Sequence, residues 1–458
     1  MTSPPTPLLQ GEGLGERSKI VSPEIESKYR GAIELQKQGQ LEQAVSEYQE
    51  IIAKYNYAPA YHRLGNICLM REQFAQAIPY YQQAIALNSS HYQAWHNLGV
   101  ALQNQREIEK AIAAFNQALS LKPNYPEALF NLANIFRESD RIEEAISHFQ
   151  QAIKLKPDYV QAYINLALAL ATQNRFAEAI PQLETALQLQ PNSAQAYAAL
   201  FRCKEMICDW QNWEIELAKL WQQTEAQINR GQATSVGTYE ALWKPWTAKQ
   251  HLAIVRSHAQ EISRKITAHS LNFTHSRSQP ERLRIGYLSN NFYNHPVSHL
   301  IQGLFSCHNR QEFEIFAYSF GIDDGSEYRQ HIAADCDQFR DLQGKSPQEI
   351  AQQIFADGIH ILVDLNGYLN EARPQILAFR PAPIQVNYLG YTGTMGADFI
   401  DYSIGDAIVT PPTEQDVFLE KLVILPHNYL AIEQAYHQMW SIYVSGNSPQ
   451  QIVINETL

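Results

Sequence analysis

A period of 34 residues constrains this chain more than any other feature of its sequence. The segments AYHRLGNICL, AWHNLGVALQ, ALFNLANIFR and AYINLALALA follow one another at that step, and each begins with alanine. Repeats of this length fold as small helical units, and one unit alone cannot bury its apolar face. Neighbouring units must therefore stack so that they share one continuous core. The period predicts an α-solenoid.

Alanine recurs at the places where two helices of such an array must approach closely. The recurring alanines are Ala60, Ala94, Ala128, Ala162 and Ala196 in one series, and Ala77, Ala111, Ala145 and Ala179 in another. Pro123, Pro157 and Pro191 end the second helix of their units, because proline lacks the backbone N–H that a continuing helix needs. The period and the alanine pattern are those of tetratricopeptide repeats. We predict about five repeats in residues 23–195.

Composition narrows the classes of partner and compartment. The net charge of -12 disfavours a nucleic acid or an anionic membrane bound by bulk electrostatics. The five cysteines form no C-x-x-C pair, which favours reduced thiols and a cytoplasmic protein. No apolar run reaches the roughly 18 residues that favour a membrane span. Residues 1–22 are rich in Pro, Gly and Ser, and we expect them to be a disordered tail.

The sequence pattern changes after the repeats. Residues 196–280 are still helical in period at first but lose the alanine series, which predicts a helical cap and a transition linker. In residues 281–430 the segments RLRIGYLS, EFEIFAYSFG, GIHILVDLNG, APIQVNYLG and DYSIGD are typical of strands. Helical patterns such as PVSHLIQGLFSC and SPQEIAQQIFADG separate them. This alternation predicts an α/β domain with a parallel sheet.

Ligands of open parallel sheets bind in the loops at the carboxyl ends of the strands, and three loops of the predicted domain are conspicuous. SNNFYNHPVSH contains His295, the stretch from DGIH to NGY contains His360, and LGYTGTMGAD is rich in glycine. A lone histidine in a loop is more often structural than catalytic, although imidazole suits general-base work. His295 and His299 have the i, i+4 spacing of helical metal ligands. No third ligand is evident, so we expect no metal site.

At these loops the sequence resembles a known family. The blocks LRIGYLSNNFYNHPVSHLIQGLF, DGIHILVDLNGY, RPAPIQVNYLGYTGT and EKLVILPH are similar, in this order, to the amino-terminal catalytic half of protein O-GlcNAc transferases, a family that includes the plant SPINDLY-type proteins. The resemblance implies a Rossmann-like half of a GT-B glycosyltransferase. It also implies transfer of a sugar from a UDP-sugar donor, UDP-GlcNAc, to Ser or Thr hydroxyls of proteins, without a required metal or other cofactor.

The resemblance also assigns roles to individual residues. His295 corresponds to the family's histidine of NHP, a candidate base, and His360 corresponds to its histidine of GIH beside the sugar site. Leu389 and Gly390 match the loop that approaches the donor. Thr392 stands in this loop where the family usually has proline, which removes a fixed φ.

The similarity is expected to stop near His427, which leaves residues 431–458 as a divergent tail. A second Rossmann-like domain does not fit in that space, so we expect the donor-binding half to be missing from this chain. A second chain could supply it.

The array carries a functional signal of its own. Asn97, Asn131 and Asn165 occupy one position of three successive repeats. A ladder of carboxamides can bind the backbone of an extended peptide, or it can bond neighbouring helices, and the residues alone favour neither. The resemblance implies an asparagine-lined groove, which favours peptide binding by these three residues. Two functions therefore remain open. One is a glycosyltransferase whose repeats recruit polypeptide substrates, and the other is a non-catalytic adaptor that carries a truncated transferase domain.

Overall fold

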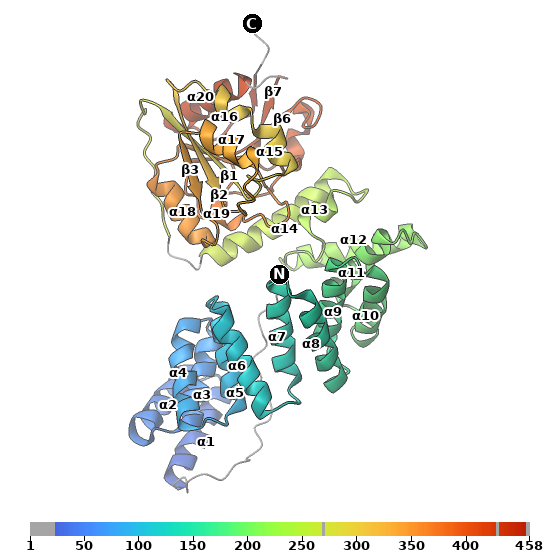
Figure 1. Cartoon of the computed structure of the whole chain (residues 1–458), viewed down its shortest axis with the longest axis vertical. Helices are drawn as coiled ribbons and strands as arrows, with labels where there is room; N and C mark the ends of the chain where they lie inside the picture. The colour runs from blue at the N-terminus through green and yellow to red at the C-terminus, as the bar shows by residue number, and fades with distance from the viewer. Residues whose placement is uncertain (1–22, 268–270, 427–429, 455–458) are drawn as a thin grey trace. The chain divides into compact units, whose positions relative to one another are not determined.

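The computed structural model describes residues 23–267, 271–426 and 430–454 (Figure 1). Two compact units, Met1–Glu216 and Leu217–Leu458, make up the chain. The tail expected at residues 1–22 lies outside the described residues. The predicted fold class, a tetratricopeptide solenoid followed by a Rossmann-like α/β half, is confirmed. The domain boundaries proposed from the sequence stay a prediction.

The first unit is a stack of antiparallel helix pairs (Figure 1). The pairs are α1 (Pro23–Lys37) with α2 (Leu41–Tyr55), α3 (Ala58–Met70) with α4 (Phe74–Leu87), α5 (Tyr92–Asn104) with α6 (Ile108–Leu121), α7 (Pro126–Glu138) with α8 (Ile142–Leu155), and α9 (Val160–Thr172) with α10 (Phe176–Leu189). Helix α11 (Ala194–Met206) follows in this unit, and α12 (Trp213–Asn229) begins in the first unit and continues into the second. Helices α6, α8 and α10 each end two residues before the proline that follows them.

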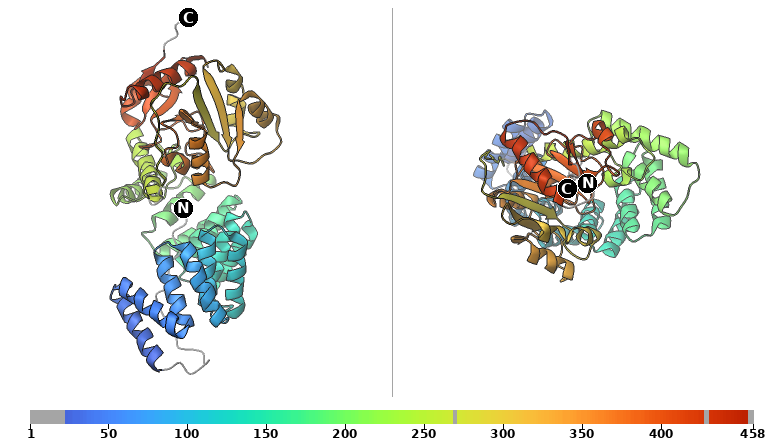
Figure 2. Two further views of the ribbon diagram at one scale, coloured as in Figure 1. Left: turned by 90° about the vertical axis from the view of Figure 1, so that its left-hand side faces the viewer. Right: turned by 90° about the horizontal axis from the view of Figure 1, so that it is seen from above.

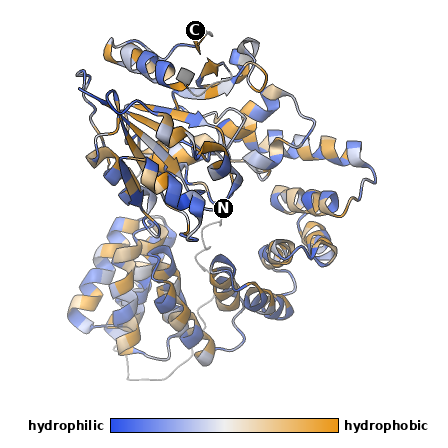
Figure 3. Ribbon diagram, turned by 45° about the horizontal axis from the view of Figure 1, so that its top comes forward, coloured by the Kyte–Doolittle hydropathy of each residue, from blue (hydrophilic) through white to orange (hydrophobic). Residues whose placement is uncertain are grey.

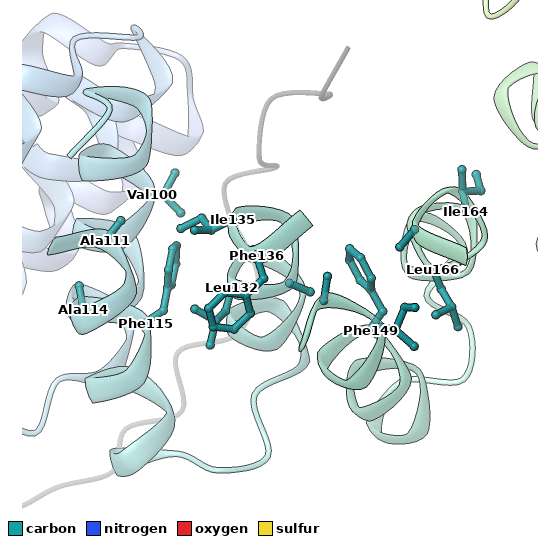
Figure 4. Packing of buried hydrophobic residues seen from close by; sticks show 14 of the residues in the cluster. Val100, Ala111, Ala114, Phe115, Leu132, Ile135, Phe136, Phe149, Ile164 and Leu166 are labelled. Atoms are coloured by element: carbon teal, nitrogen blue, oxygen red, sulfur yellow. The ribbon is translucent and has the colours of Figure 1, made fainter. Parts of the chain in front are cut away.

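The repeat core is built from alanines beside one large ring or leucine per unit. All nine recurring alanines are fully buried, and so are Tyr81, Phe115, Phe149 and Leu183. Figure 4 shows Phe115 and Phe149 reaching toward neighbouring helices, with Leu132 and Ile135 beside them. The small residue lets one helix approach while the ring fills the space between units. This arrangement explains why the period appears so plainly in the sequence.

The second unit contains one sheet of eight parallel strands in the order β3-β2-β1-β4-β5-β6-β7-β8. The strands are β1 (Leu283–Ser289), β2 (Phe313–Ser319), β3 (Gln338–Asp341), β4 (Ile361–Asp364), β5 (Ile384–Tyr388), β6 (Tyr402–Asp406), β7 (Lys421–Leu425) and β8 (Ile452–Val453). Five of them, β1, β2, β4, β5 and β6, coincide with the predicted strands.

Helices cover both faces of this sheet (Figure 2). One apolar cluster joins the strands to α15 (Pro296–Ile301), α16 (Leu304–Cys307), α17 (Glu327–Asp335) and α20 (Leu430–Val444). Another joins them to α14 (Ala248–Thr267), α18 (Pro347–Ala356) and α19 (Gln375–Ala378). The short helices α13 (Thr238–Ala241) and η1 (Pro412–Val417) complete the unit.

Hydropathy follows the layers of the fold. In Figure 3 hydrophobic colour is concentrated in the strands, and the helices carry both hydrophobic and hydrophilic residues. Among the residues that the structure describes, no helix combines the length and apolar character needed to cross a membrane.

Residues 430–454 belong to the α/β fold, although sequence reasoning predicted no element there. Strand β8 pairs with β7, and α20 packs against β5 and β7. Tyr436 is fully buried, and its hydroxyl lies 2.9 Å from that of Tyr287 on β1. The Tyr287 hydroxyl also bonds His308 Nε2 at 2.8 Å. This buried polar chain fixes α20 on the sheet.

Candidate functional site

The strand order reverses its direction of growth at β1. From β1 the chain adds β2 and β3 on one side, and then crosses to add β4, β5 and the remaining strands on the other. In open parallel sheets, ligands bind outside the carboxyl ends of the strands at such a switch point. The candidate site therefore lies where the loops after β1 and β4 meet.

Two asparagines join these loops. The Asn290 backbone N–H donates to Asn366 Oδ1 at 2.9 Å, and the Asn366 amide donates in return to Asn290 Oδ1. Both residues are buried. The loop after β2 also presses on this point, because any side chain at Gly321 would collide with the Asn290 carbonyl. The loops after β1, β2 and β4 therefore pack closely against one another at the switch point.

Asp364 is the last residue of β4 and directly precedes the loop that forms part of the candidate site. Its side chain is 3% exposed and accepts bonds from the backbone N–H groups of Asn366 at 3.1 Å and Gly367 at 2.9 Å. Burial raises the pKa of this carboxyl to about 7, although the two N–H groups oppose the shift. Asp364 therefore shapes the loop after β4, and sequence reasoning missed it. The signal was an acid at the end of the apolar run ILVD.

His295 lies on the loop after β1 and caps helix α15. Its Nδ1 accepts a bond from the Val297 backbone N–H at 3.2 Å, and the ring is half-buried. Burial, followed by the neighbouring His299, lowers the pKa of His295. The ring is therefore neutral near pH 7, and because Nδ1 is an acceptor, the proton sits on Nε2. In this state His295 is a hydrogen-bond donor.

The predicted donor loop reaches the same edge of the sheet. Leu389 has a φ of 70°, and a side chain on Gly390 would collide with the Leu365 carbonyl just beyond β4. The loop after β5 therefore lies directly against the loop after β4. Thr392 is exposed on this loop. The structure thus brings Leu389 and Gly390 to the edge that also carries His295.

His360 does not lie at this edge. It precedes β4, and its Nδ1 accepts a bond from the Arg284 backbone N–H at 2.9 Å near the beginning of β1. Its ring packs edge-on against Trp440 on α20, with centroids 4.8 Å apart. Burial lowers the pKa of His360 to about 4. The four residues of β4 separate it from the site by roughly 13 Å, so the structure does not bring His360 and His295 together.

The asparagine ladder lies on the first helices of successive repeats and bonds them to one another. The Asn97 amide donates to Asn66 Oδ1 at 2.8 Å and lies 3.2 Å from His62 Nε2. Asn131 Nδ2 lies 2.9 Å from His96 Nε2. Asn131 and Asn165 are buried.

Asn165 completes the ladder with different partners. Its amide donates to Asn134 Oδ1 at 2.8 Å, and its Oδ1 accepts from the Gln161 amide at 3.1 Å. Every ladder asparagine therefore has a helix-bridging role. Peptide binding by these three residues stays a prediction.

Within the described parts of the chain, no group of three or more His, Cys, Asp or Glu side chains is placed to hold a metal ion. That the reaction requires no metal stays a prediction from the resemblance.

The fold and the switch-point site define a doubly wound α/β unit attached to a tetratricopeptide array. Known proteins identify the family. Residues 207–444, more than half of the chain, match the model of glycosyl transferase family 41, and this chain belongs to that family. The match runs through α20, so the expectation that the family pattern stops near His427 was wrong. Residues 26–234 also match the C-terminal domain of cilia and flagella-associated protein 70.

Curated relatives confirm the resemblance to protein O-GlcNAc transferases and SPINDLY-type proteins. The chain is 37% identical over 243 residues to a UDP-N-acetylglucosamine--peptide N-acetylglucosaminyltransferase of Caenorhabditis elegans, covering 50% of this chain and 21% of the relative. It is 38% identical over 238 residues to the probable enzyme SEC of Arabidopsis thaliana, covering 50% and 24%. The SPINDLY protein of Solanum lycopersicum is 32% identical over 155 residues, covering 33% and 17%.

A solved structure of a mutant Thermobaculum terrenum O-GlcNAc transferase is also similar. It matches with a TM-score of 0.45 and 23% identity, covering 74% of this chain and 58% of that one. The chain thus spans less than a quarter of the length of the two most similar curated relatives described above.

Proposed function

We propose that this chain takes part in protein O-glycosylation, the transfer of N-acetylglucosamine from UDP-GlcNAc to Ser or Thr hydroxyls. The observation that carries the proposal is the meeting of three loops at the switch point, with His295 on the first of them, in a chain of glycosyl transferase family 41. In such a transfer the hydroxyl oxygen attacks the anomeric carbon, the bond from that carbon to the diphosphate breaks, and UDP leaves with the bonding electrons.

The state of His295 limits its part in this reaction. With Nδ1 occupied by the Val297 N–H, Nε2 carries the proton and can donate to an oxygen of the sugar or the diphosphate. The same nitrogen cannot accept the proton of the hydroxyl, so another group must take it. We therefore propose His295 as a donor that stabilises developing negative charge rather than as the general base.

The loop of Leu389, Gly390 and Thr392 is the proposed wall of the donor site. Gly390 allows the backbone to lie against β4, and the left-handed φ of Leu389 turns the chain at the edge of the sheet. The Gly390 N–H donates to the Tyr388 carbonyl at 2.9 Å, which holds the turn in this shape. The repeats are proposed to hold the polypeptide that carries the acceptor hydroxyl.

A non-catalytic adaptor is the second candidate, and a hollow in the array favours it. This hollow, of about 440 Å³, lies among α4, α5 and α6, and apolar side chains such as Ile78, Trp95 and Leu98 line it together with Glu107 and Lys110. A peptide side chain could bind there whether or not the α/β unit is active.

Titration calorimetry with UDP-GlcNAc, followed by transfer of radiolabelled sugar to an acceptor protein, separates the two candidates. The glycosyltransferase candidate predicts saturable donor binding and protein labelling by the chain, and the adaptor candidate predicts neither. His295→Ala should lower labelling by about 100-fold if the lost donor is worth near 3 kcal/mol. His299→Ala is the matched control, because the His299 side chain is exposed and contacts Asn294 Oδ1 and the Tyr328 ring. Absence of both binding and labelling at about 10 mM donor would leave the adaptor candidate.

A further inference from the structure

The α/β unit contains a second hollow whose lining is rich in arginine. It encloses about 570 Å³ between helix α14 and the loop that follows β5. Its lining comprises Arg230, Gly231, Arg256, Ala259, Gln260, Ser263, Arg264, Gly396 and Asp398. Gly396 and Asp398 of this lining belong to the glycine-rich loop LGYTGTMGAD, and the switch-point site uses none of the side chains of the hollow.

One face of α14 forms most of the wall. Arg256, Gln260, Ser263 and Arg264 recur at the i, i+4, i+7, i+8 spacing of a single helical face. The opposite face of the same helix packs into the apolar cluster on the sheet. The polar face is therefore held in place by a buried one.

The loop after β5 forms the facing wall. Gly396 has a φ of 57°, and a Cβ there would lie 2.7 Å from Val255 Cγ2 and 2.9 Å from the Arg256 backbone nitrogen. The backbone of the loop therefore lies in direct contact with α14 at Gly396, and a residue with a side chain would not fit there. This contact places Asp398 in the hollow opposite the arginines.

The hollow holds more hydrogen-bond donors than its own residues use. In the part of the chain that the structure describes, the side chains of Arg230, Arg256, Gln260 and Ser263 make no hydrogen bond or ion pair. Arg264 donates to the Gly231 carbonyl at 2.8 Å and pairs with Glu261 at 2.7 Å. Asp398 is the single acid of the lining. Three arginines, one of them paired with Glu261, thus line the hollow together with one carboxylate, in a chain of net charge -12.

We propose that this hollow binds a phosphate group. Each guanidinium offers a planar fork of N–H donors that matches phosphate oxygens, and the amide of Gln260 and the hydroxyl of Ser263 add donors between the forks. The two oxygens of a carboxylate are satisfied by a single guanidinium group, whereas a phosphate has enough oxygens to accept hydrogen bonds from several guanidinium groups. Near pH 7 a phosphate monoester carries a charge of about -1.5 to -2, which Asp398 only partly opposes. The proposal does not rest on the transferase activity.

The phosphate can come from free orthophosphate or from a phosphorylated side chain of a polypeptide. Both sources are tested on the full chain by titration calorimetry in chloride buffer, with inorganic phosphate as one probe. The other probe is a short peptide with a central phosphoserine, compared with the same peptide carrying serine. If the phosphoserine peptide binds more tightly than orthophosphate, the natural source is a polypeptide. Equal or weaker binding of the peptide assigns the hollow to free phosphate.

Three variants test whether the charges that line the hollow determine its affinity for phosphate. Arg256→Gln should raise the dissociation constant for phosphate about tenfold, and Asp398→Asn should lower it several-fold because the opposing charge is gone. Lys265→Gln is the matched control: it removes one positive charge from α14 but lies outside the lining and contacts Glu261 at 3.4 Å. It should change the constant less than about twofold. No saturable binding of either probe up to about 10 mM, or an equal loss in Arg256→Gln and Lys265→Gln, would overturn the proposal.

Discussion

His96 makes the stability of the repeat array depend on pH. The ring is 6% exposed, and both of its nitrogens are engaged in the neutral form. Nδ1–H donates to Asn97 Oδ1 at 3.0 Å, and Nε2 accepts from the Asn131 amide at 2.9 Å. Protonation would set a second N–H against the Asn131 amide hydrogens. Burial lowers the pKa of His96 to about 4, with the Asn97 bond opposing the shift.

The sign and size of the effect follow from proton linkage. An unfolded chain gives histidine a pKa of about 6.5, so it binds the proton before the folded chain does as the pH falls. Stability is therefore complete above pH 6.5 and is lost as the pH falls from about 6.5 to about 4. Each pH unit inside this window costs about 1.4 kcal/mol. Between pH 7 and pH 5 the loss attributable to His96 is about 2 kcal/mol.

The neighbouring repeat supplies the variant that tests this reasoning. Phe130 occupies the position of His96 one period later, so His96→Phe places a ring the array already accommodates. Urea unfolding followed by helical circular dichroism at pH 7, 6 and 5 measures the stability of parent and variant. The parent should lose about 2 kcal/mol more than the variant between pH 7 and pH 5.

A half-buried histidine provides the control for that measurement. His148 on α8 contacts the Glu144 carbonyl and the Phe136 ring, and His148→Phe leaves the buried His96 in place, so it should keep the pH dependence of the parent. If His96→Phe also keeps it to within about 0.5 kcal/mol, then burial of His96 does not govern the acid sensitivity of the array and the reasoning is refuted.

Three further substitutions test the core and the site. Phe149→Ala should cost about 3–5 kcal/mol in urea unfolding, because the ring is fully buried between repeats; a cost below about 1 kcal/mol would contradict the packing. Gly321→Ala should weaken UDP-GlcNAc binding in calorimetry, because the new Cβ must displace the Asn290 carbonyl; an unchanged affinity would count against a switch-point site. His360→Ala should lower the melting temperature and leave donor affinity unchanged, since the residue supports β1 and Trp440; a tenfold change in affinity would place it in the site after all.

Of the three strands that the sequence prediction did not include, β3 and β8 differ from the predicted strands in burial or length, whereas β7 is a mostly buried apolar run. Strand β4 is buried along its whole length, and its apolar run is visible in the sequence. Strand β3, with the sequence QFRD, lies at the edge of the sheet and has exposed or half-buried side chains throughout. Strand β8 has only two residues. Pairing with β2 and β7 creates these two strands, so no local pattern announces them.

The position of His360 could not be obtained from the sequence for a related reason. GIHILVDLNG contains a histidine before a strand of four residues and an Asn-Gly after it, and both ends look like loops rich in functional side chains. Only the second end lies at the carboxyl edge of the sheet. The contact that gives His360 its role, with the backbone of Arg284, joins residues that are 76 positions apart.

The role of the asparagine ladder also depends on contacts between residues that are far apart in the sequence. Both amide hydrogens of Asn97 are directed at the preceding repeat, one toward His62 and one toward Asn66. In the described residues Asn131 and Asn165 each commit one amide hydrogen, to His96 and to Asn134. A peptide backbone needs a donor that the helices have not already used. Asn97 therefore uses both amide hydrogens to join two repeats, and Asn131 and Asn165 are buried; peptide binding by this ladder stays a prediction.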